Sequence, residues 1–300
     1  MNWGMRLGLL AAIWGCSFLF IKVALEGLSP AQVVLGRMAA GSAALLVVAA
    51  IRRQHLPREP VLWFHLAAFS VLGNLLPFLL FAWGEQHISS SRAGVLNATT
   101  PLFTLLVVML ALPHERPTRN RVVGLVIGFA GVVVVVGPWA RSSSEAIGGQ
   151  VGCLTAAAMY GVGFVYTSRF VAWRGVAPGV LAAAQLLAGT VLLGAVTPVV
   201  GWEPVHLTAR VVLSVLALGA VGTGVAYLLY HGLLRDVGAT STSLVTYLVP
   251  VAAVVLGVLV LGEPLTWNLF AGALVVIAGV AMAEGRLGQR ARRATMLRRT

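Results

Sequence analysis

The chain has 300 residues, of which 59% are hydrophobic and 10% charged, and its mean hydropathy is +0.92. A soluble domain of this length does not need so apolar a composition, so these values exclude a water-soluble enzyme and indicate an integral membrane protein. The net charge of +12 would suit nucleic-acid binding. The charges are distributed as membrane topology requires, however, and we expect no nucleic-acid partner.

Ten apolar stretches are each near the roughly 20 residues that a helix needs to cross the hydrocarbon core. They lie at about 5–25, 31–51, 61–83, 92–111, 121–137, 147–170, 178–200, 210–232, 239–261 and 266–283. Short polar turns separate them and leave no room for a soluble domain. Stretches this long predict helices, because barrel strands would be half as long and would alternate in polarity. We therefore expect an all-α, multi-pass membrane protein with ten transmembrane helices in the lipid bilayer.

Basic residues gather on one side of this predicted bundle. With ten spans, both termini and the loops after spans 2, 4, 6 and 8 share a side, which holds most arginines and the basic tail 284–300. The other side holds only Lys22, Arg92, Arg141 and Arg210. This bias predicts that both termini lie in the cytoplasm, and the tail would also contact anionic lipid. We expect the membrane to be the cell inner membrane.

The two halves of the chain resemble each other in sequence. Pro101 maps onto Pro250 at an offset of 149, and Glu115 maps onto Glu263 at an offset of 148. In both halves the proline lies within an apolar run, the glutamate follows that run, and a Gly-rich apolar run comes after the glutamate. A repeat this long indicates a duplicated membrane unit.

Each repeated unit contains five of the ten spans. The first unit covers residues 1–137 and the second covers 147–283, followed by the tail 284–300. Because five is odd, the second unit enters the membrane from the opposite side. The sequence therefore predicts two inverted five-helix repeats. Inverted units that exchange conformations can open a central site first to one side and then to the other, which favours a transporter.

A set of short motifs runs through both units. They are Trp14-Gly15 in span 1, Pro30 and Arg37 in span 2, Pro101 and Pro250 in spans 4 and 9, and Leu261-Gly262-Glu263-Pro264 before a Gly-rich last span. Together they resemble the EamA family of the drug/metabolite transporter superfamily, over essentially the whole chain. The first unit departs from the pattern at its turn, which is one residue longer: Leu112-Pro113-His114-Glu115-Arg116.

The resemblance implies a ten-helix bundle whose central cavity is lined by spans 1, 3, 4, 6, 8 and 9. It also implies a secondary transporter of amino acids, other metabolites, drugs or nucleotide sugars, without a cofactor. We expect a small-molecule substrate such as an amino acid, moved outward by alternating access.

Two prolines mark the predicted points of flexing. Pro101 and Pro250 lack the N–H that would bond the carbonyl four residues earlier, and those carbonyls belong to Asn97 and Thr246. Each half would thus have a weakened helix with a free acceptor beside a polar side chain. This predicts flexing at the prolines and substrate contacts at Asn97 and Thr246. A kink that only improves packing is the alternative.

Aromatic residues inside spans are the next candidates for substrate contact. Trp14 is predicted to lie in the middle of a span, whereas the other seven tryptophans lie near span ends. Its repeat partner Tyr160 would face it, and the two rings would offer flat apolar walls to an amphipathic solute. Packing of Trp14 in the bundle core is the alternative. Tyr227 and Tyr247, in spans 8 and 9, are further candidates.

Two charged or titratable residues each have two alternative roles. His231, near the cytoplasmic end of span 8, is a candidate for proton coupling, or a histidine that is simply hydrogen-bonded at the interface. Lys22 would either pair with Glu26 on the same helix or bind a substrate carboxylate. Every Asp and Glu, including Glu85, is placed at a span end or in a loop, so we expect no carboxylate relay at the midplane.

Other classes of function and assembly stay open. A membrane-embedded enzyme acting on a lipid-linked substrate would need a nucleophile, a base or a metal site. His231 and Asp236 form an H-x4-D pattern, but a five-residue offset places them on different helix faces. A non-transporting scaffold also fits, because fold does not fix function. The small-residue pair Gly124 and Gly128 would serve either a homodimer contact or packing within the monomer.

Overall fold

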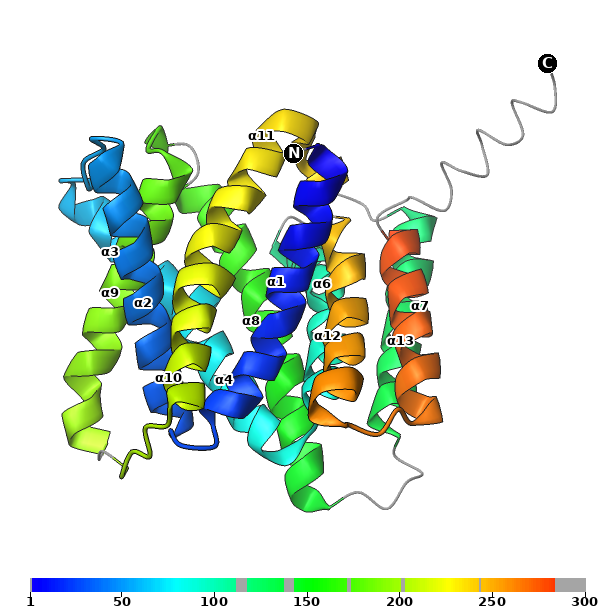
Figure 1. Ribbon diagram of the computed structural model, residues 1–300. Helices are drawn as coiled ribbons and strands as arrows, with labels where there is room; N and C mark the ends of the chain where they lie inside the picture. The colour runs from blue at the N-terminus through cyan, green and yellow to red at the C-terminus, as the bar shows by residue number, and fades with distance from the viewer. Residues whose placement is uncertain are drawn as a thin grey trace.

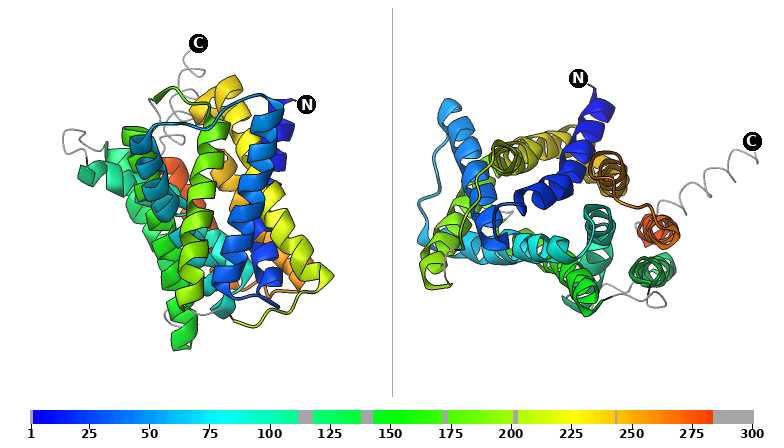
Figure 2. Two further views of the ribbon diagram at one scale, coloured as in Figure 1. Left: turned by 90° about the vertical axis from the view of Figure 1, so that its left-hand side faces the viewer. Right: turned by 60° about the horizontal axis from the view of Figure 1, so that its bottom comes forward.

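The computed structural model describes residues 2–111, 118–137, 143–171, 174–200, 203–242 and 244–283, and within these ranges it contains helices and no strand. The elements are α1 (Trp3–Ala24), α2 (Pro30–Ile51), α3 (Pro60–Ser70), η1 (Val71–Leu75), α4 (Leu76–His87), α5 (Ser90–Asn97), α6 (Thr100–Ala111), α7 (Arg119–Val136), α8 (Ser144–Phe170), α9 (Pro178–Val200), α10 (Ala209–Leu216), η3 (Ala217–Val225), α11 (Ala226–Thr242), α12 (Val245–Leu261) and α13 (Trp267–Ala283). They form one bundle, drawn in Figures 1 and 2.

The helices have the length and composition of membrane spans. Among the described residues, eight helical segments are long and apolar enough to cross a membrane, and the shorter apolar helices α12 and α13 accompany them. Each of the ten predicted stretches coincides with one of these segments. The expectation of an all-α, multi-pass membrane protein is thus confirmed. The predicted turn at 112–116 and the basic tail 284–300 lie outside the described residues.

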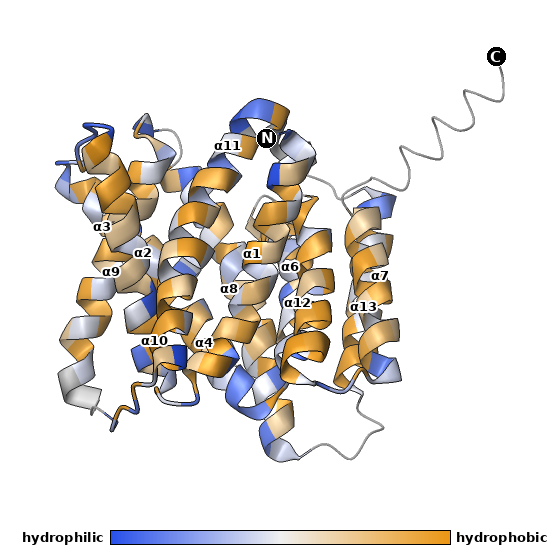
Figure 3. Ribbon diagram, in the orientation of Figure 1, coloured by the Kyte–Doolittle hydropathy of each residue, from blue (hydrophilic) through white to orange (hydrophobic). Residues whose placement is uncertain are grey.

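Two ends of the bundle can be distinguished. We call the end at which α1 begins the amino-terminal end, and the end at which α1 finishes the opposite end. Hydrophilic residues concentrate toward both ends of the bundle and hydrophobic residues between them (Figure 3). At the amino-terminal end, Arg6 pairs with Asp236 at 2.8 Å and Arg174 pairs with Glu59 at 3.0 Å.

Two of the long segments contain a π-helical stretch. The stretch η1 joins α3 to α4, and η3 joins α10 to α11, which places one in the third helical segment of each half. A π turn widens the helix and leaves backbone groups to be re-paired, and such turns are frequent at functional sites. In η3, the Thr223 hydroxyl donates to the Leu218 carbonyl at 3.0 Å. Segment 8 continues to Thr242, beyond the predicted end at residue 232, so His231 lies about three turns inside the helix.

Helices α7 and α13 pack against each other on one flank of the bundle (Figures 1 and 2). Small residues form the seam, since a Cβ added at Gly131 would lie 2.6 Å from the Val276 nitrogen and one at Gly124 would overlap the Ala283 backbone. A Cβ at Gly279 would likewise overlap Gly128. The pair Gly124 and Gly128 therefore serves packing within the monomer, which was one of the two alternatives for this span.

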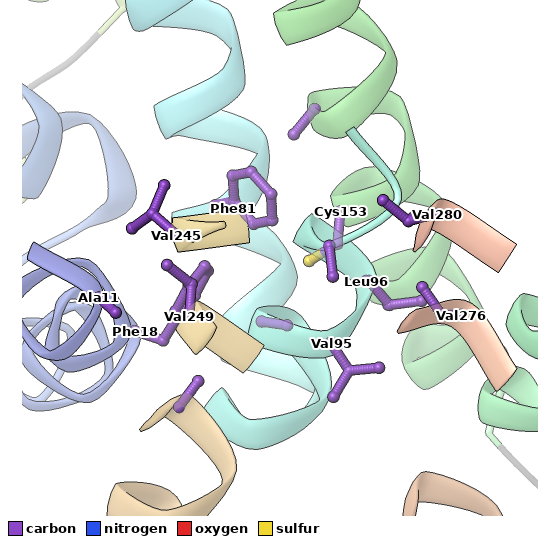
Figure 4. Close-up of a cluster of buried hydrophobic side chains, with 14 of the residues drawn as sticks. Ala11, Phe18, Phe81, Val95, Leu96, Cys153, Val245, Val249, Val276 and Val280 are labelled. Atoms are coloured by element: carbon purple, nitrogen blue, oxygen red, sulfur yellow. The ribbon is translucent and has the colours of Figure 1, made fainter. Parts of the chain in front are cut away.

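The largest core cluster lies where α1, α4, α5, α8 and α12 meet. Figure 4 shows the Phe81 ring near Val245 and Val249, with Phe18 beside Val249, and Cys153 next to Leu96. Phe18 and Phe81 meet edge to face at a centroid distance of 5.7 Å. Trp14, Tyr160 and Tyr247, all half-buried, pack around the same cluster. The core thus joins helices from both halves of the chain.

Candidate functional site

Three of the predicted site residues meet in one aromatic cluster between α1 and α11. Trp14 lies beside Tyr230, with ring centroids 5.7 Å apart. His231 meets the edge of Tyr230 at 5.4 Å and stacks on Tyr227 at 6.1 Å. The Tyr227 hydroxyl reaches Asn74 of η1 at 3.5 Å. We call Trp14, Tyr227, Tyr230 and His231 the aromatic cluster.

Tyr160 belongs to a different group of rings. Its centroid is 6.0 Å from that of Phe81 and 6.4 Å from those of Phe78 and Phe164. Trp14 therefore has Tyr230 as its ring partner, and the expected face-to-face arrangement with Tyr160 is corrected. The physical reason is helix packing, because α1 lies against α11 while α8 lies against α4.

A buried arginine lies beside both groups of rings. The guanidinium carbon of Arg37 is 3.8 Å above the centre of the Phe78 ring, and its Nε donates to the Thr223 hydroxyl at 3.2 Å. Only 9% of Arg37 is exposed. A cation over an aromatic face is stabilised by the ring quadrupole, and planar guanidinium groups suit carboxylates. The middle of the bundle thus offers apolar rings with one fixed positive charge.

A groove opens from the aromatic cluster toward the amino-terminal end. It has a volume of about 520 Å³ and runs between the end of α2, the start of α9 and α11. Its lining residues are Leu45, Val48, Ala49, Arg52, Gln54, Ala177, Pro178, Gly179, Leu228, His231, Gly232 and Arg235. The walls are mostly apolar, and the charged lining groups are basic. Sequence reasoning missed this groove, because its walls come from three spans that are distant in the chain.

The two prolines lie in different local structures. Pro250 is buried inside α12, as expected. Pro101 instead lies in the first turn of α6, after a break at Ala98 and Thr99 that separates α5 from α6. The Asn97 carbonyl accepts a hydrogen bond from the Thr100 hydroxyl at 2.8 Å. The expectation of a free acceptor at Asn97 is therefore wrong, since a neighbouring hydroxyl replaces the missing N–H.

The remaining polar candidates lie on α5 and α12. Asn97 ends α5 and is half-buried. Thr246 and Tyr247 lie in the first turn of α12 and are half-buried as well. Tyr247 packs against the core cluster that Trp14 and Tyr160 also contact. Tyr247 thus lies in the same region of the bundle as Trp14 and Tyr160.

Lys22 binds main-chain oxygens and not Glu26, one of its two expected partners, while its contact with a substrate carboxylate stays a prediction. Its ammonium group donates to the main-chain oxygens of Glu85 and of Ile88, the latter at 3.0 Å. Glu26 pairs instead with Arg210 at 3.5 Å. The last carbonyls of a helix have no partner within the helix, and a cation there stabilises the end. Lys22 therefore caps α4, which ends at His87.

A carboxylate latch lies at the opposite end of the bundle. The Glu263 carboxylate accepts bonds from the Ser90 and Ser91 nitrogens at 2.7 and 2.9 Å and from the Ser91 hydroxyl at 2.5 Å. It thereby joins the α12–α13 turn to the first turn of α5. Partial burial alone would raise the pKa of Glu263, but the hydrogen bonds from Ser91 and Ser90 outweigh it and lower the pKa below its usual value.

The structure also reveals a site residue that sequence reasoning missed. Glu85 is fully buried (0% exposed), although it lies only two residues before the end of α4. Nothing in the sequence indicated this burial, because a carboxylate near the end of a membrane span is ordinarily exposed to water. Asp236, the acid of the H-x4-D pattern, pairs with Arg6 and Arg235 at the amino-terminal end.

Comparison with known families agrees with this architecture. The model of the EamA-like transporter family matches residues 2–137 and again residues 147–284. The chain belongs to the EamA-like transporter family. The resemblance noted from the motifs is confirmed, and membrane transport is the class of activity that the family indicates.

Individual relatives of this EamA-like transporter cover nearly its whole length. It is 30% identical over 298 residues to the "Probable terminal-alkyne amino-acid exporter" of Streptantibioticus cattleyicolor, covering 95% of each chain. It is 30% identical over 293 residues to the "Uncharacterized inner membrane transporter YedA" of Escherichia coli, covering 91% of this chain and 88% of the relative. A solved structure titled "Crystal structure of protein" has a TM-score of 0.66 at 22% identity, covering 92% of this chain and 94% of its own, which supports the fold.

Proposed function

We propose that this EamA-like transporter is a secondary exporter of a small metabolite such as an amino acid, and that it works by alternating access. One relative, 30% identical over 95% of each chain, is named as a probable amino-acid exporter. The aromatic cluster and the cation of Arg37 offer apolar walls and a positive charge, which suit an amphipathic solute with a carboxylate. The E. coli relative is named as an inner-membrane transporter, which supports the same location here.

The observation that carries this proposal is the way the two halves pack. Each helix of one half contacts the other half as its counterpart in the repeat does. Helix α1 packs on α12 as α8 packs on α6, and α2 packs on η3 as α9 packs on α3 and η1. Helices α7 and α13 pair with each other. These contacts are those expected of two inverted five-helix units, 1–137 and 147–283. The distribution of basic residues supports both termini in the cytoplasm. Rocking of the two units would open one end while the other closes.

Residue roles follow from position. Solute would enter the groove at the amino-terminal end and reach Trp14, Tyr227 and His231. Tyr160, Asn97, Thr246 and Tyr247 would complete the binding region as the units move. The helix break before Pro101 and the proline inside α12, Pro250, would permit flexing. Lys22 holds the end of α4. His231 lies on the groove wall, where it would also be accessible to protons.

Counterflow in proteoliposomes tests this function. Vesicles containing the full chain would be loaded in turn with unlabelled amino acids, nucleosides, sugars and quaternary amines, and each would be offered its labelled counterpart. We expect accumulation of the amino acid class. Trp14→Ala should lower that exchange at least tenfold, while Trp3→Ala, at the exposed start of the same helix, should not. Absence of exchange for every class, or full exchange by Trp14→Ala, would contradict the proposal.

A further inference from the structure

A carboxyl group without a partner is buried at the opposite end of the bundle. Glu85 has no exposed surface, and neither carboxyl oxygen has a hydrogen-bond partner in the described protein. Burial of an ionised carboxylate without hydrogen bonds is far more costly than burial of a neutral carboxyl, and the group ordinarily takes up a proton instead. The burial of Glu85 therefore favours the protonated form in this conformation.

The charges around Glu85 do not supply a counter-ion bound to it. Those within electrostatic reach are Lys22 of α1, Arg37 of α2 and Glu263 of the α12–α13 turn. The Lys22 ammonium donates to two main-chain carbonyls, that of Glu85 itself and that of Ile88. Arg37 is directed to Phe78 and Thr223. Glu263 carries a like charge, which opposes a second carboxylate nearby.

The other elements packed on α4 add little charge. Helix α8 contributes the thiol of Cys153 and the buried amide of Gln150, whose two polar atoms also have no protein partner. Helix α5 contributes Arg92, and η1 contains no titratable residue. His87, on α4 itself, lies against the Trp83 ring.

Close packing leaves little space beside Glu85. A Cβ added at the adjacent Gly84 would lie 2.7 Å from the Cys153 sulfur and 2.8 Å from the Gly149 oxygen. A Cβ at Gly257 would overlap the side chains of Ser91 and Glu263. A metal ion would also need several oxygen ligands, and the nearest charged side chain is a lysine. A proton is the cation that fits.

We propose that Glu85 is a proton-binding site that couples export to the proton gradient. The carboxyl carries its proton while the opposite end is closed. When that end opens, water reaches the carboxyl and a proton from the outer solution joins a carboxylate oxygen. The proton stays bound while the end closes again. It leaves to water at the amino-terminal end when further opening of the groove reaches the carboxyl, and Lys22 then becomes free to pair with the carboxylate. One proton thus enters as solute leaves, and no other bond changes. The coupling rests on the proposed export function, whereas the proton binding does not.

His231 is the competing proton site. It is half-buried, stacked on Tyr227, and lines the groove at the amino-terminal end. Water in the groove would reach its ring in this conformation, so it would exchange protons with the near solution. Glu85 is sealed from both solutions, as a group must be while it carries a proton between them. If Glu85 is the coupling site, Glu85→Gln loses the dependence of transport on the proton gradient. If His231 is the coupling site, His231→Gln loses it instead.

Infrared spectroscopy of the purified full chain tests the proton site without any transported solute. At neutral pH we expect the C=O stretching band of a protonated carboxyl in wild type and in Glu26→Gln, whose carboxylate lies half-exposed at the same end. The band should be absent in Glu85→Gln, a neutral variant of the same shape that should fold. Glu85→Asp, which keeps the acid, should shift the band. A wild type without the band, or a band that survives in Glu85→Gln, would overturn the proposal.

Transport in proteoliposomes tests the coupling. Counterflow needs no net proton movement, so Glu85→Gln should retain it, while accumulation driven by a pH gradient should fall at least tenfold, to the level without a gradient. Glu26→Gln should behave as wild type. Loss of gradient dependence in His231→Gln together with its retention in Glu85→Gln would overturn the coupling. If wild type exchanges no solute, the export function fails, and the infrared result still decides the proton site.

Discussion

The two ends of the bundle differ in how closely the same residue type is packed. At the amino-terminal end, a Cβ added at Gly179 or Gly232 would have its nearest neighbour 3.7 or 3.8 Å away, and a groove of about 520 Å³ lies beside them. At the opposite end, a Cβ at Gly94 would overlap Ala253 and one at Gly257 would overlap Ser91. The helices are therefore spaced more widely around the groove than along the seam of α5 with α12, and the groove gives water access from the amino-terminal end.

The polar contacts of the two ends also differ, in how strongly they stabilise the bundle. The pair of Arg6 with Asp236 at the amino-terminal end has side chains that are 24% and 34% exposed, and such pairs stabilise little because water screens them. At the opposite end, Glu263 accepts three hydrogen bonds from Ser90 and Ser91 of the other half. Bonds to a charged group are about twice as strong as neutral ones. Opening the opposite end therefore requires breaking a stronger contact.

The largest effect is expected from overpacking the sealed end. Gly94→Leu should lower the free energy of unfolding by about 3 kcal/mol, because the side chain must displace Ala253 on α12 and overpacked cores typically cost about 1–3 kcal/mol. Gly8→Leu, in α1 where no atom lies within 4 Å, should be neutral or slightly stabilising. Thermal unfolding in detergent measures both. Equal melting temperatures for the two variants would contradict the packing difference.

Removal of the latch charge should have the next largest effect. Glu263→Gln keeps the shape but weakens the bonds from Ser90 and Ser91, and hydrogen bonds to charged groups contribute about 1.5–3 kcal/mol when buried. Because Glu263 is half-buried, we expect a loss of about 1 kcal/mol in thermal unfolding. The opposite end should also open more often, which thiol labelling of Ser91→Cys would detect. Unchanged labelling in the Glu263→Gln background would argue against a latch.

The latch also predicts how stability depends on pH. Hydrogen bonds from Ser91 and Ser90 lower the pKa of Glu263 in the folded protein below its value in the unfolded chain. Its contribution is therefore complete above the unfolded value, about 4.3, and is lost as the pH falls through the folded value. Melting temperatures between pH 3 and pH 7 should fall less on acidification in Glu263→Gln than in wild type. Parallel curves would refute this assignment.

The smallest effect is expected at the amino-terminal end. Glu59→Gln removes the partner of Arg174, but the Glu59 side chain is 71% exposed. Exposed ion pairs contribute about 0–1 kcal/mol, so the melting temperature should hardly change, and raised salt should remove any difference. A loss equal to that of Glu263→Gln would show that the two ends are not distinct in this respect.

Sequence patterns predicted the helices better than their contacts. The apolar stretches located every helical segment because membrane length and hydropathy are local properties. The free acceptor predicted at Asn97 was wrong because the Thr100 hydroxyl re-pairs that carbonyl, while flexing at Pro101 stays a prediction. The pair of Lys22 with Glu26 was wrong because the end of α4, which is distant in the chain, supplies the acceptors of Lys22. Glu85 was missed for the same reason, since its burial depends on other helices.

The most direct test of alternating access measures both ends at once. In a background without native cysteines, spin labels would be placed at Glu26 and Leu265 for the opposite end, and at Gln54 and Arg235 for the amino-terminal end, all of them exposed. Pulsed electron paramagnetic resonance would record both distances with and without an exchanged solute and at acid and neutral pH. We predict that one distance lengthens as the other shortens. Two distances that stay constant, or that change together, would contradict the account.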